Sequence, residues 1–280
     1  MKKELFVLAI GLCMIAMISC ATAVVNKISP GDTIFVGEGD LDITGALGGY
    51  NTIAYWLPGD DPAVDEWYYM KKISDPELFF VDPMEFMGNS GKWYLWDGKS
   101  AGEVAFAVDE PRISLQILDA ATKEDITNTR VRQGSEVNFR ITTNMYNATN
   151  RAGYSPEDTF ISLTVNTPDG DSLPGIVCSD GEKVSLRNLP VDTKEWYWIG
   201  EGEDHTVAAP GGGWNTGAES NTGKKIYEAG KYTIQATSDL NGMDDLYRAP
   251  DGSEYIGKTA TPVKNVEIFV SGGGGGGGSL

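Results

Sequence analysis

Hydrophobic residues alternate with polar ones along much of this chain, and this period of two constrains the fold more than any other feature. Apolar side chains recur at every second position in five segments, at 113–117, 137–141, 161–165, 232–236 and 266–270. Alternation of this kind, bounded by Gly, Pro, Asn and Asp clusters, is typical of antiparallel strands with one buried face. Helical periodicity is hard to find after the first 23 residues. The chain is therefore expected to be all-β.

Repeated strands without intervening helices favour sandwiches or barrels. A polar break at Asp109-Glu110-Pro111 separates two such groups, which predicts two β-sandwich-like domains at 24–110 and 111–270. The expected strands of the first group are Thr33–Val36, Thr52–Leu57, Leu78–Val81, Lys92–Trp96 and Val104–Val108, with one helical turn at Pro83–Phe86. In the second group, Gly230 and Tyr232 open an alternating strand. This pattern resembles the late strand of immunoglobulin-like domains, where a tyrosine hydroxyl bonds back to a loop.

The first 23 residues have the three parts of a signal peptide. Lys2 and Lys3 form the charged start, Leu5–Ile18 the apolar middle, and Ala21-Thr22-Ala23 the small residues read by a signal peptidase. We therefore expect export to the cell surface or the extracellular space, with cleavage before Val24. Retention as an uncleaved anchor and lipidation at Cys20 are the alternatives.

The chain ends in seven glycines, Gly272–Gly278, followed by Ser279 and Leu280. A run of glycine is costly to order and behaves as a flexible spacer. We expect residues 271–280 to be a flexible tail and the first part of a stalk, with an attachment point beyond it. Whether the chain is a fragment without its C-terminal anchor stays open.

The composition is strongly acidic, with 40 Asp and Glu against 22 Lys and Arg and a formal net charge of −18. Such a surface repels nucleic acid, whose phosphates need basic partners. It also attracts cations, so an acidic loop could hold calcium. The candidate ligands are Asp239, Asn241, Asp244 and Asp245. Their spacing does not match an EF-hand, and a turn between strands is the alternative.

Residues for catalysis are sparse. His205 is the single histidine, and it lies in a glycine-rich segment without a nucleophile motif nearby. Adjacent carboxylates such as Asp65-Glu66 are common in a chain this acidic, and adjacency alone does not make the facing pair that glycosidases use. Cys178 is the one cysteine that remains after signal cleavage, so no internal disulfide is expected. The protein is predicted not to be an enzyme and to need no cofactor except, in one alternative, calcium.

Aromatic residues are the richer feature, because they gather in three clusters at 67–69, 93–96 and 196–198. On a strand, Trp93 and Leu95 would face one side while Tyr94 and Trp96 face the other. Exposed aromatics can stack on sugar rings or bury into a partner; the alternative is that they cap the ends of the sandwiches. The ligand or partner candidates are Trp67, Trp93, Trp96, Trp196, Trp198 and Trp214.

A single N-glycosylation pattern occurs at Asn147-Ala148-Thr149. In an exported β protein such a pattern is expected on a surface loop. Asn147 is therefore a candidate for glycosylation, and whether it is used stays open.

Several segments share their order with a known domain: Ile28–Glu38, Leu41–Thr44, Gly91–Trp96, Gln133–Tyr146, Trp196–Trp198, Trp214–Ala218 and Ala229–Thr233. Together they resemble a domain of unknown function found in secreted surface proteins of methanogenic archaea. The resemblance implies export, a β-rich fold and a place in the cell envelope, such as a surface layer or sheath. It carries over no catalytic residues.

These observations predict an exported, non-enzymatic structural module of the cell envelope. It would pack against copies of itself or against other envelope proteins, with no nucleic acid and with a membrane contact only through a missing anchor or a lipidated Cys20. The first alternative is a carbohydrate-binding or adhesion module that uses the surface aromatics. The second is a glycan hydrolase.

Overall fold

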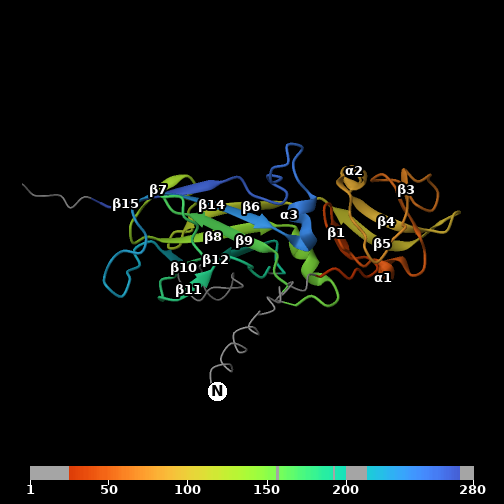
Figure 1. Cartoon of the computed structure of the whole chain (residues 1–280). Helices are drawn as coiled ribbons and strands as arrows, with labels where there is room; N and C mark the ends of the chain where they lie inside the picture. Colours follow the sequence, from red (N-terminus) through yellow and green to blue (C-terminus); the bar gives the residue numbers. More distant parts are fainter. Residues whose placement is uncertain (1–24, 156–157, 192, 200–212, 272–280) are drawn as a thin grey trace, which may run out of the picture.

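The computed structural model describes residues 25–155, 158–191, 193–199 and 213–271. The signal-like segment, His205 and the glycine run lie outside these residues. The described chain is nearly all β, as the alternation predicts, and its strands form two units that lie side by side (Figure 1). All strands of the first unit precede Glu110, and all strands of the second unit follow it.

The first unit contains one five-stranded sheet in the order β1-β5-β4-β2-β3. Its strands are β1 (Thr33–Phe35), β2 (Thr52–Tyr55), β3 (Tyr69–Lys72), β4 (Gly91–Trp96) and β5 (Ala101–Asp109). The short helices α1 (Thr44–Leu47) and α2 (Pro83–Phe86) bring Leu47 and Phe86 into the core of this unit. Pro83 begins α2 as predicted, where its missing N–H is no loss, and Asp82 caps the helix by accepting a hydrogen bond from the Met84 amide.

The second unit is an immunoglobulin-like sandwich of two four-stranded sheets. In one, β8 (Glu136–Thr143) pairs with β6 (Ile113–Asp119) on one side and with β12 (Trp196–Ile199) and β13 (Trp214–Asn215) on the other. The other sheet has the order β7-β15-β14-β9. Its strands are β7 (Thr129–Arg132), β9 (Ile161–Asn166), β14 (Gly230–Ser238) and β15 (Lys264–Phe269). Two further strands, β10 (Gly175–Val177) and β11 (Lys183–Ser185), pair only with each other.

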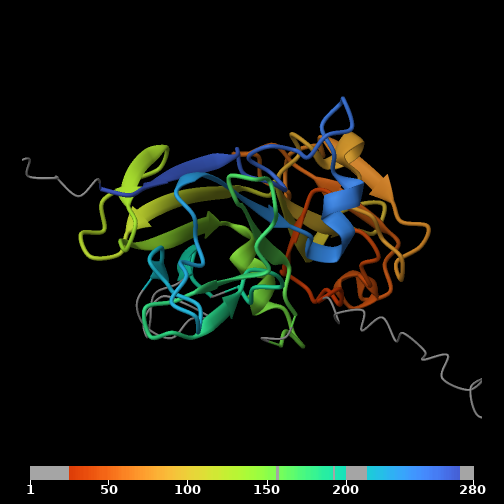
Figure 2. The ribbon, with the colours of Figure 1, turned by 60° about the vertical axis from the view of Figure 1, so that its left-hand side comes forward.

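The two sheets of the second unit face each other (Figure 2), and Trp214 joins them. Its ring stacks on Phe139 of β8 at 6.1 Å and meets Tyr232 of β14 edge-on at 5.3 Å, centroid to centroid. The predicted immunoglobulin-like tyrosine is confirmed, because the Tyr232 hydroxyl donates to the Glu228 carbonyl at 3.0 Å. Aromatic packing across the sandwich therefore fixes the core of this unit.

Burial raises the pKa of Tyr232 to about 12, and that of Tyr247 also to about 12. In the unfolded chain both ionise near their ordinary pKa of about 10. The folded state therefore keeps these protons to a higher pH than the unfolded chain does. Their contribution to the free energy of unfolding is fully present below pH 10 and is lost as the pH rises toward 12.

We expect urea unfolding midpoints to fall between pH 10 and 12, with tyrosinate absorbance at 295 nm rising together with unfolding. The Tyr232→Phe variant should lose less stability over this interval than the wild type does. An unchanged midpoint between pH 10 and 12 would show that these phenols are not held neutral by the fold.

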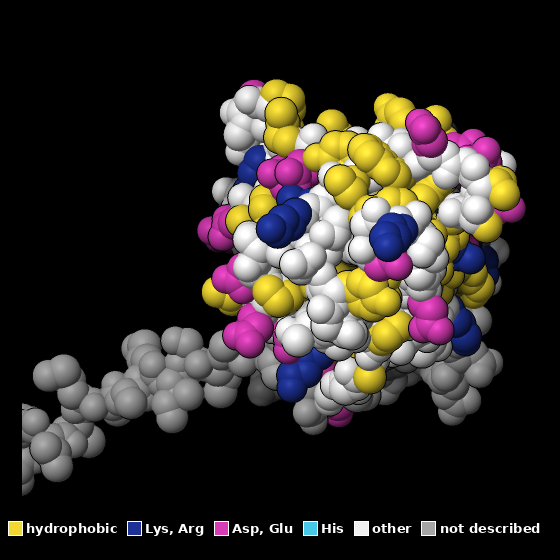
Figure 3. Space-filling model, turned by 90° about the vertical axis from the view of Figure 1, so that its right-hand side faces the viewer, with side chains coloured by type: hydrophobic (Ala, Val, Ile, Leu, Met, Phe, Trp, Pro, Cys, Tyr) yellow, Lys and Arg dark blue, Asp and Glu magenta, His cyan; other side chains and the backbone are white. Residues whose placement is uncertain are grey.

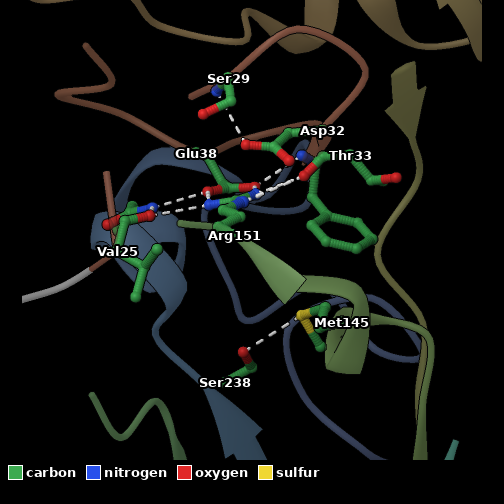
Figure 4. A network of polar contacts seen from close by, with 10 residues as sticks. Val25, Ser29, Asp32, Thr33, Glu38, Met145, Arg151 and Ser238 are labelled. Carbon is green, nitrogen blue, oxygen red and sulfur yellow. Dashed lines mark hydrogen bonds and ion pairs between the residues drawn. The ribbon is translucent and has the colours of Figure 1, made fainter. Parts of the chain in front are cut away.

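The two units are joined by a fully buried ion pair between Glu38 of the first and Arg151 of the second (Figure 4). The two Arg151 terminal nitrogens donate to the Glu38 carboxylate at 2.6 and 2.8 Å and also to the carbonyls of Thr33 and Val25. The same carboxylate accepts from the Phe35 amide at 2.6 Å and from the Asn241 side chain at 2.7 Å. These hydrogen bonds and the opposite charge compensate for the hydration that both groups lose on burial.

Close backbone packing completes the contact between the units. A Cβ at Gly37 would lie 2.4 Å from the Cβ of Tyr247, and one at Gly39 would lie 2.4 Å from the Leu246 Cδ1. Leu246 ends α3 (Met243–Leu246), which follows the short 3-10 helix η2 (Leu240–Gly242) and lies between the units in Figure 1. At Gly37, where φ is also +95°, only glycine allows this approach, so the two units pack closely at this point.

Candidate functional site

The structure separates the candidate tryptophans into core and surface residues. Trp93 and Trp214 are fully buried, so the prediction that they contact a ligand or partner is wrong. Trp93 stacks on Tyr55 at 5.3 Å, and its ring lies tilted against Phe86 at 4.8 Å, centroid to centroid, within the first core. These two residues are required for packing and are unavailable to an external ligand.

The 196–198 cluster forms β12, which pairs with the centre of β8. Tyr197 is buried, and the Trp196 ring is half-buried with the Arg140 guanidinium 4.8 Å from its centroid. That contact is a cation–π interaction within the domain. The side chain of Trp198 lies outside the described residues, so its candidacy stays a prediction.

Trp67 and Trp96 come together at one pocket of the first unit, although they are 29 positions apart in the sequence. The pocket has a volume of about 620 Å³. Trp67 is 42% exposed and Trp96 is half-buried. The remaining lining comes from residues 62–66 of the β2–β3 loop and 99–101 at the β4–β5 turn. Two loops of different hairpins thus form its walls.

The β2–β3 loop is held in place by its own polar groups. The Asp61 carbonyl accepts from the amides of Val64 and Asp65 at 3.0 and 2.9 Å. In return the Asp65 carboxylate accepts from the Asp61 amide at 2.7 Å. Such side-chain to backbone hydrogen bonds take the place of the backbone hydrogen bonds that paired strands make and a loop lacks. Residues 61–66 therefore have one defined shape beside Trp67.

The β4–β5 turn is built around Asp97. Its Oδ1 accepts from the amides of Lys99 and Ser100 at 2.7 and 2.8 Å, and Gly98 supplies a positive φ of 95°. These hydrogen bonds, that from Ser100 first, lower the pKa of Asp97. The carboxylate therefore stays ionised at neutral pH and keeps Trp96 and Lys99 at the pocket wall.

Trp56 contacts both sides of the pocket from the interior of the first unit, a role that the sequence did not predict. It is buried, its Nε1 donates to the Asp65 carbonyl at 3.0 Å, and its ring lies 6.1 Å from Trp96 and 5.6 Å from Tyr94, centroid to centroid. Trp56 thus ties the β2–β3 loop to the side of β4 that faces away from Trp93. The one available signal was its position just after an alternating strand.

Charged groups line the rim of the pocket. Asp65 and Glu66 come from one loop and Lys99 from the other. Within the described residues, Glu66 and Lys99 take part in no side-chain ion pair or hydrogen bond, while one Asp65 oxygen is held by the loop. The pocket therefore combines two indole walls with a free carboxylate and a free ammonium group, an arrangement suited to binding.

A family model matches residues 30–245, which is most of the chain and includes both pocket loops and both residues of the buried ion pair. The matching family is described as "Domain of unknown function (DUF3821)". The chain belongs to this family. No curated protein is significantly similar to it in sequence.

The DUF3821 chain aligns with solved structures only distantly. The C-terminal domain of the Streptococcus agalactiae AgI/II polypeptide BspA has 13% identity and a TM-score of 0.28, over 85% of this chain and 95% of that one. A chain named "BspA_C_WT" has 14% identity and the same TM-score, over 85% and 96%. A TM-score this low does not indicate a common fold.

The calcium candidates of the DUF3821 chain are not brought together as a cation site. Asn241 turns its amide to Glu38 and to the Val25 carbonyl, while Asp244 and Asp245 pair with Arg248. The Asp239 carboxylate accepts from the Asp244 amide at 3.2 Å. Across the described ranges no cluster of three or more His, Cys, Asp or Glu side chains could hold a metal ion. The arrangement of these residues lends the calcium hypothesis no support, and it stays a prediction.

The remaining candidates lie away from the pocket. Asn147 is on the 3-10 helix η1 (Met145–Asn150), half-buried, while the Thr149 hydroxyl donates to the Tyr146 carbonyl at 2.7 Å. Cys178 is buried, and desolvation raises the pKa of its thiol to about 11. It is a core residue as predicted. Cys20 lies outside the described residues, and in the part that is described no helix is long and apolar enough to span a bilayer.

Proposed function

We propose that this protein is an exported, non-enzymatic module of the cell surface that acts by binding. Its main contacts are with copies of itself or with other envelope proteins, in a layer or sheath of the kind found on archaeal cells. The signal-like pattern of residues 1–23 supports export. The acidic composition suits an outer surface and argues against a nucleic acid partner.

The observation that carries this proposal is the distribution of exposed apolar side chains. Nine of the fourteen large hydrophobic residues that are exposed in the described chain lie between positions 50 and 87. They are Tyr50, Leu57, Val64, Trp67, Tyr68, Met70, Leu78, Met84 and Met87. Figure 3 shows the end of the molecule that the first unit forms, where hydrophobic side chains gather among acidic ones. Exposed groups of this kind mark interaction surfaces.

The arrangement of the two units supports the same proposal. The buried Glu38–Arg151 pair and the contacts of Gly37 and Gly39 make the first unit a fixed extension of the second. A binding surface on a fixed body loses little conformational entropy on association. The second unit is then a support that presents the first.

Disruption of this surface tests the proposal. Met84 is 91% exposed at the start of α2, where a negative charge is favourable to the helix. We expect the mature wild-type chain to associate at micromolar concentration, and Met84→Glu to weaken association about tenfold, as an interface residue does. Sedimentation equilibrium, with electron microscopy of the assemblies with and without calcium, measures this.

Ile226→Glu is the matched control, because Ile226 is 44% exposed and belongs to the second unit. It should leave association unchanged. A wild-type chain that stays monomeric at high concentration and binds no envelope fraction would contradict the proposal. Equal loss in both variants would place the surface elsewhere.

The aromatic pocket favours a second candidate function, carbohydrate binding or adhesion. A glycan hydrolase has less support, because Asp65 and Glu66 are neighbours on one loop and the Asp65 carboxylate is held by that loop. Hydrolysis needs two carboxylates on opposite sides of the scissile bond. Turnover of a polysaccharide that one Asp or Glu substitution abolishes would restore the hydrolase hypothesis.

A further inference from the structure

We infer that the pocket between Trp67 and Trp96 binds a sugar ring of a surface glycan. This inference rests on the proposed function as a surface binding module and names a ligand for one site on it. The pocket volume of about 620 Å³ lies within the range of small-ligand sites, whereas two other pockets of the first unit measure about 220 and 240 Å³. It can hold a disaccharide-sized segment.

The two indoles provide the apolar part of recognition. A pyranose has a face of C–H groups, and an aromatic ring offers a flat, electron-rich surface that accepts such groups. Trp67 is 42% exposed, and Trp96 lies against the buried Trp56. Because both loops are held by their own hydrogen bonds, little ordering is needed when a ring enters.

The rim provides partners for hydroxyl groups. The Glu66 carboxylate accepts hydrogen bonds and the Lys99 ammonium donates them, while the Ser100 hydroxyl, which donates its proton to Asp97 Oδ2 at 3.2 Å, can accept. Within the described chain neither Glu66 nor Lys99 is held by an ion pair. A sugar hydroxyl donates and accepts at once, so it can bond to each of these groups.

The charges argue against other small ligands. Phosphate or another anion is repelled by Asp65, Glu66 and the net charge of −18. An ammonium ligand, which two indoles could hold, is repelled by Lys99, although Asp65 and Glu66 attract it. A neutral polyhydroxyl ligand is repelled by neither sign of charge, and binding of an ammonium compound in its place would overturn the inference. A proline-rich peptide could also stack on tryptophans, but the pocket is bounded by two loops and lined by free charges, which favours the sugar.

The test is a glycan array probed with the mature protein, followed by calorimetric titration of β1,4-linked tetrasaccharides of glucose, N-acetylglucosamine and mannose. We expect at least one glycan to bind. Trp96→Ala and Trp67→Ala should each weaken binding at least tenfold, and Glu66→Gln and Lys99→Met severalfold. Trp196→Ala is the control, since Trp196 is half-buried on the second unit, and it should leave binding unchanged. Thermal unfolding of each variant checks that it is folded.

Absence of binding on the array, binding that survives both tryptophan substitutions, or binding of a proline-rich peptide in place of the glycans would overturn the inference. Sedimentation of the same samples separates the two proposals. Association without glycan binding overturns the sugar site and leaves the proposed function standing. Absence of both overturns the two together.

Discussion

Replacing Arg151 with alanine is expected to lower the free energy of unfolding by about 3–5 kcal/mol, because the Glu38 carboxylate would then be buried without its counter-charge. Glu38 is fully buried and its partners after the change would be only the Phe35 amide and the Asn241 side chain. Urea unfolding of residues 24–280, followed by tryptophan fluorescence, measures the loss.

Two controls make this result specific. Lys224→Ala removes an exposed ion pair with Glu228, which should cost less than about 1 kcal/mol. The double variant Glu38→Leu/Arg151→Met removes both charges together and should recover much of the stability lost in Arg151→Ala. A loss below 1 kcal/mol in Arg151→Ala would show that the pair is hydrated and does not join the units.

Replacing Trp214 with alanine is the second large effect, with an expected loss of about 3–5 kcal/mol. Trp214 is fully buried and touches Phe139, Tyr227 and Tyr232, so its removal leaves a cavity between the two sheets of the second unit. Urea unfolding monitored by circular dichroism measures the loss without relying on the removed fluorophore.

Trp67→Ala is the matched comparison, because Trp67 is 42% exposed on the first unit. It should change the free energy of unfolding by less than about 1 kcal/mol. Similar losses in the two variants would contradict the assignment of one tryptophan to the core and the other to the surface.

Period-two alternation predicted five strands of the second unit, because their alternating apolar residues face the core; the exception is Val270, which is 61% exposed just after β15 ends. Ile161, Leu163 and Val165 of β9 are buried as the pattern required. The Gly230 and Tyr232 pattern also predicted a hydrogen bond that the structure contains. Local patterning is decisive where one side of a strand meets a core and the other meets solvent.

The first unit was harder to predict, because its loops also bury apolar residues. Leu78–Val81 was expected to be a strand, yet it makes only an isolated bridge through Phe79 to Leu41. The strand β3 (Tyr69–Lys72) was missed, because Met70 is exposed and Lys71 and Lys72 carry charges suited to a sheet edge. In the second unit, β12 was not among the expected strands, because its three consecutive aromatic residues hide any alternation.

The candidate site could be predicted in part. Alternation placed Trp93 and Trp96 on opposite faces of β4, but only the fold shows that Trp93 points into the core. Trp67 and Trp96 meet because two hairpin loops converge, which no local pattern reveals. The Glu38–Arg151 pair joins residues 113 positions apart, and neither residue has a distinguishing neighbour in the sequence except the glycines around Glu38.

The aromatic surface of the first unit is expected to bind a ligand, while the tryptophans of the cores only support it. Indole resonances of the seven tryptophans can be followed by two-dimensional NMR during titration with the three tetrasaccharides. We expect chemical shift changes at Trp67 and Trp96, a smaller change at Trp56 and none at Trp93 or Trp214. Unmoved resonances at Trp67 and Trp96, or larger changes at Trp93 and Trp214, would show that the surface does not bind these ligands.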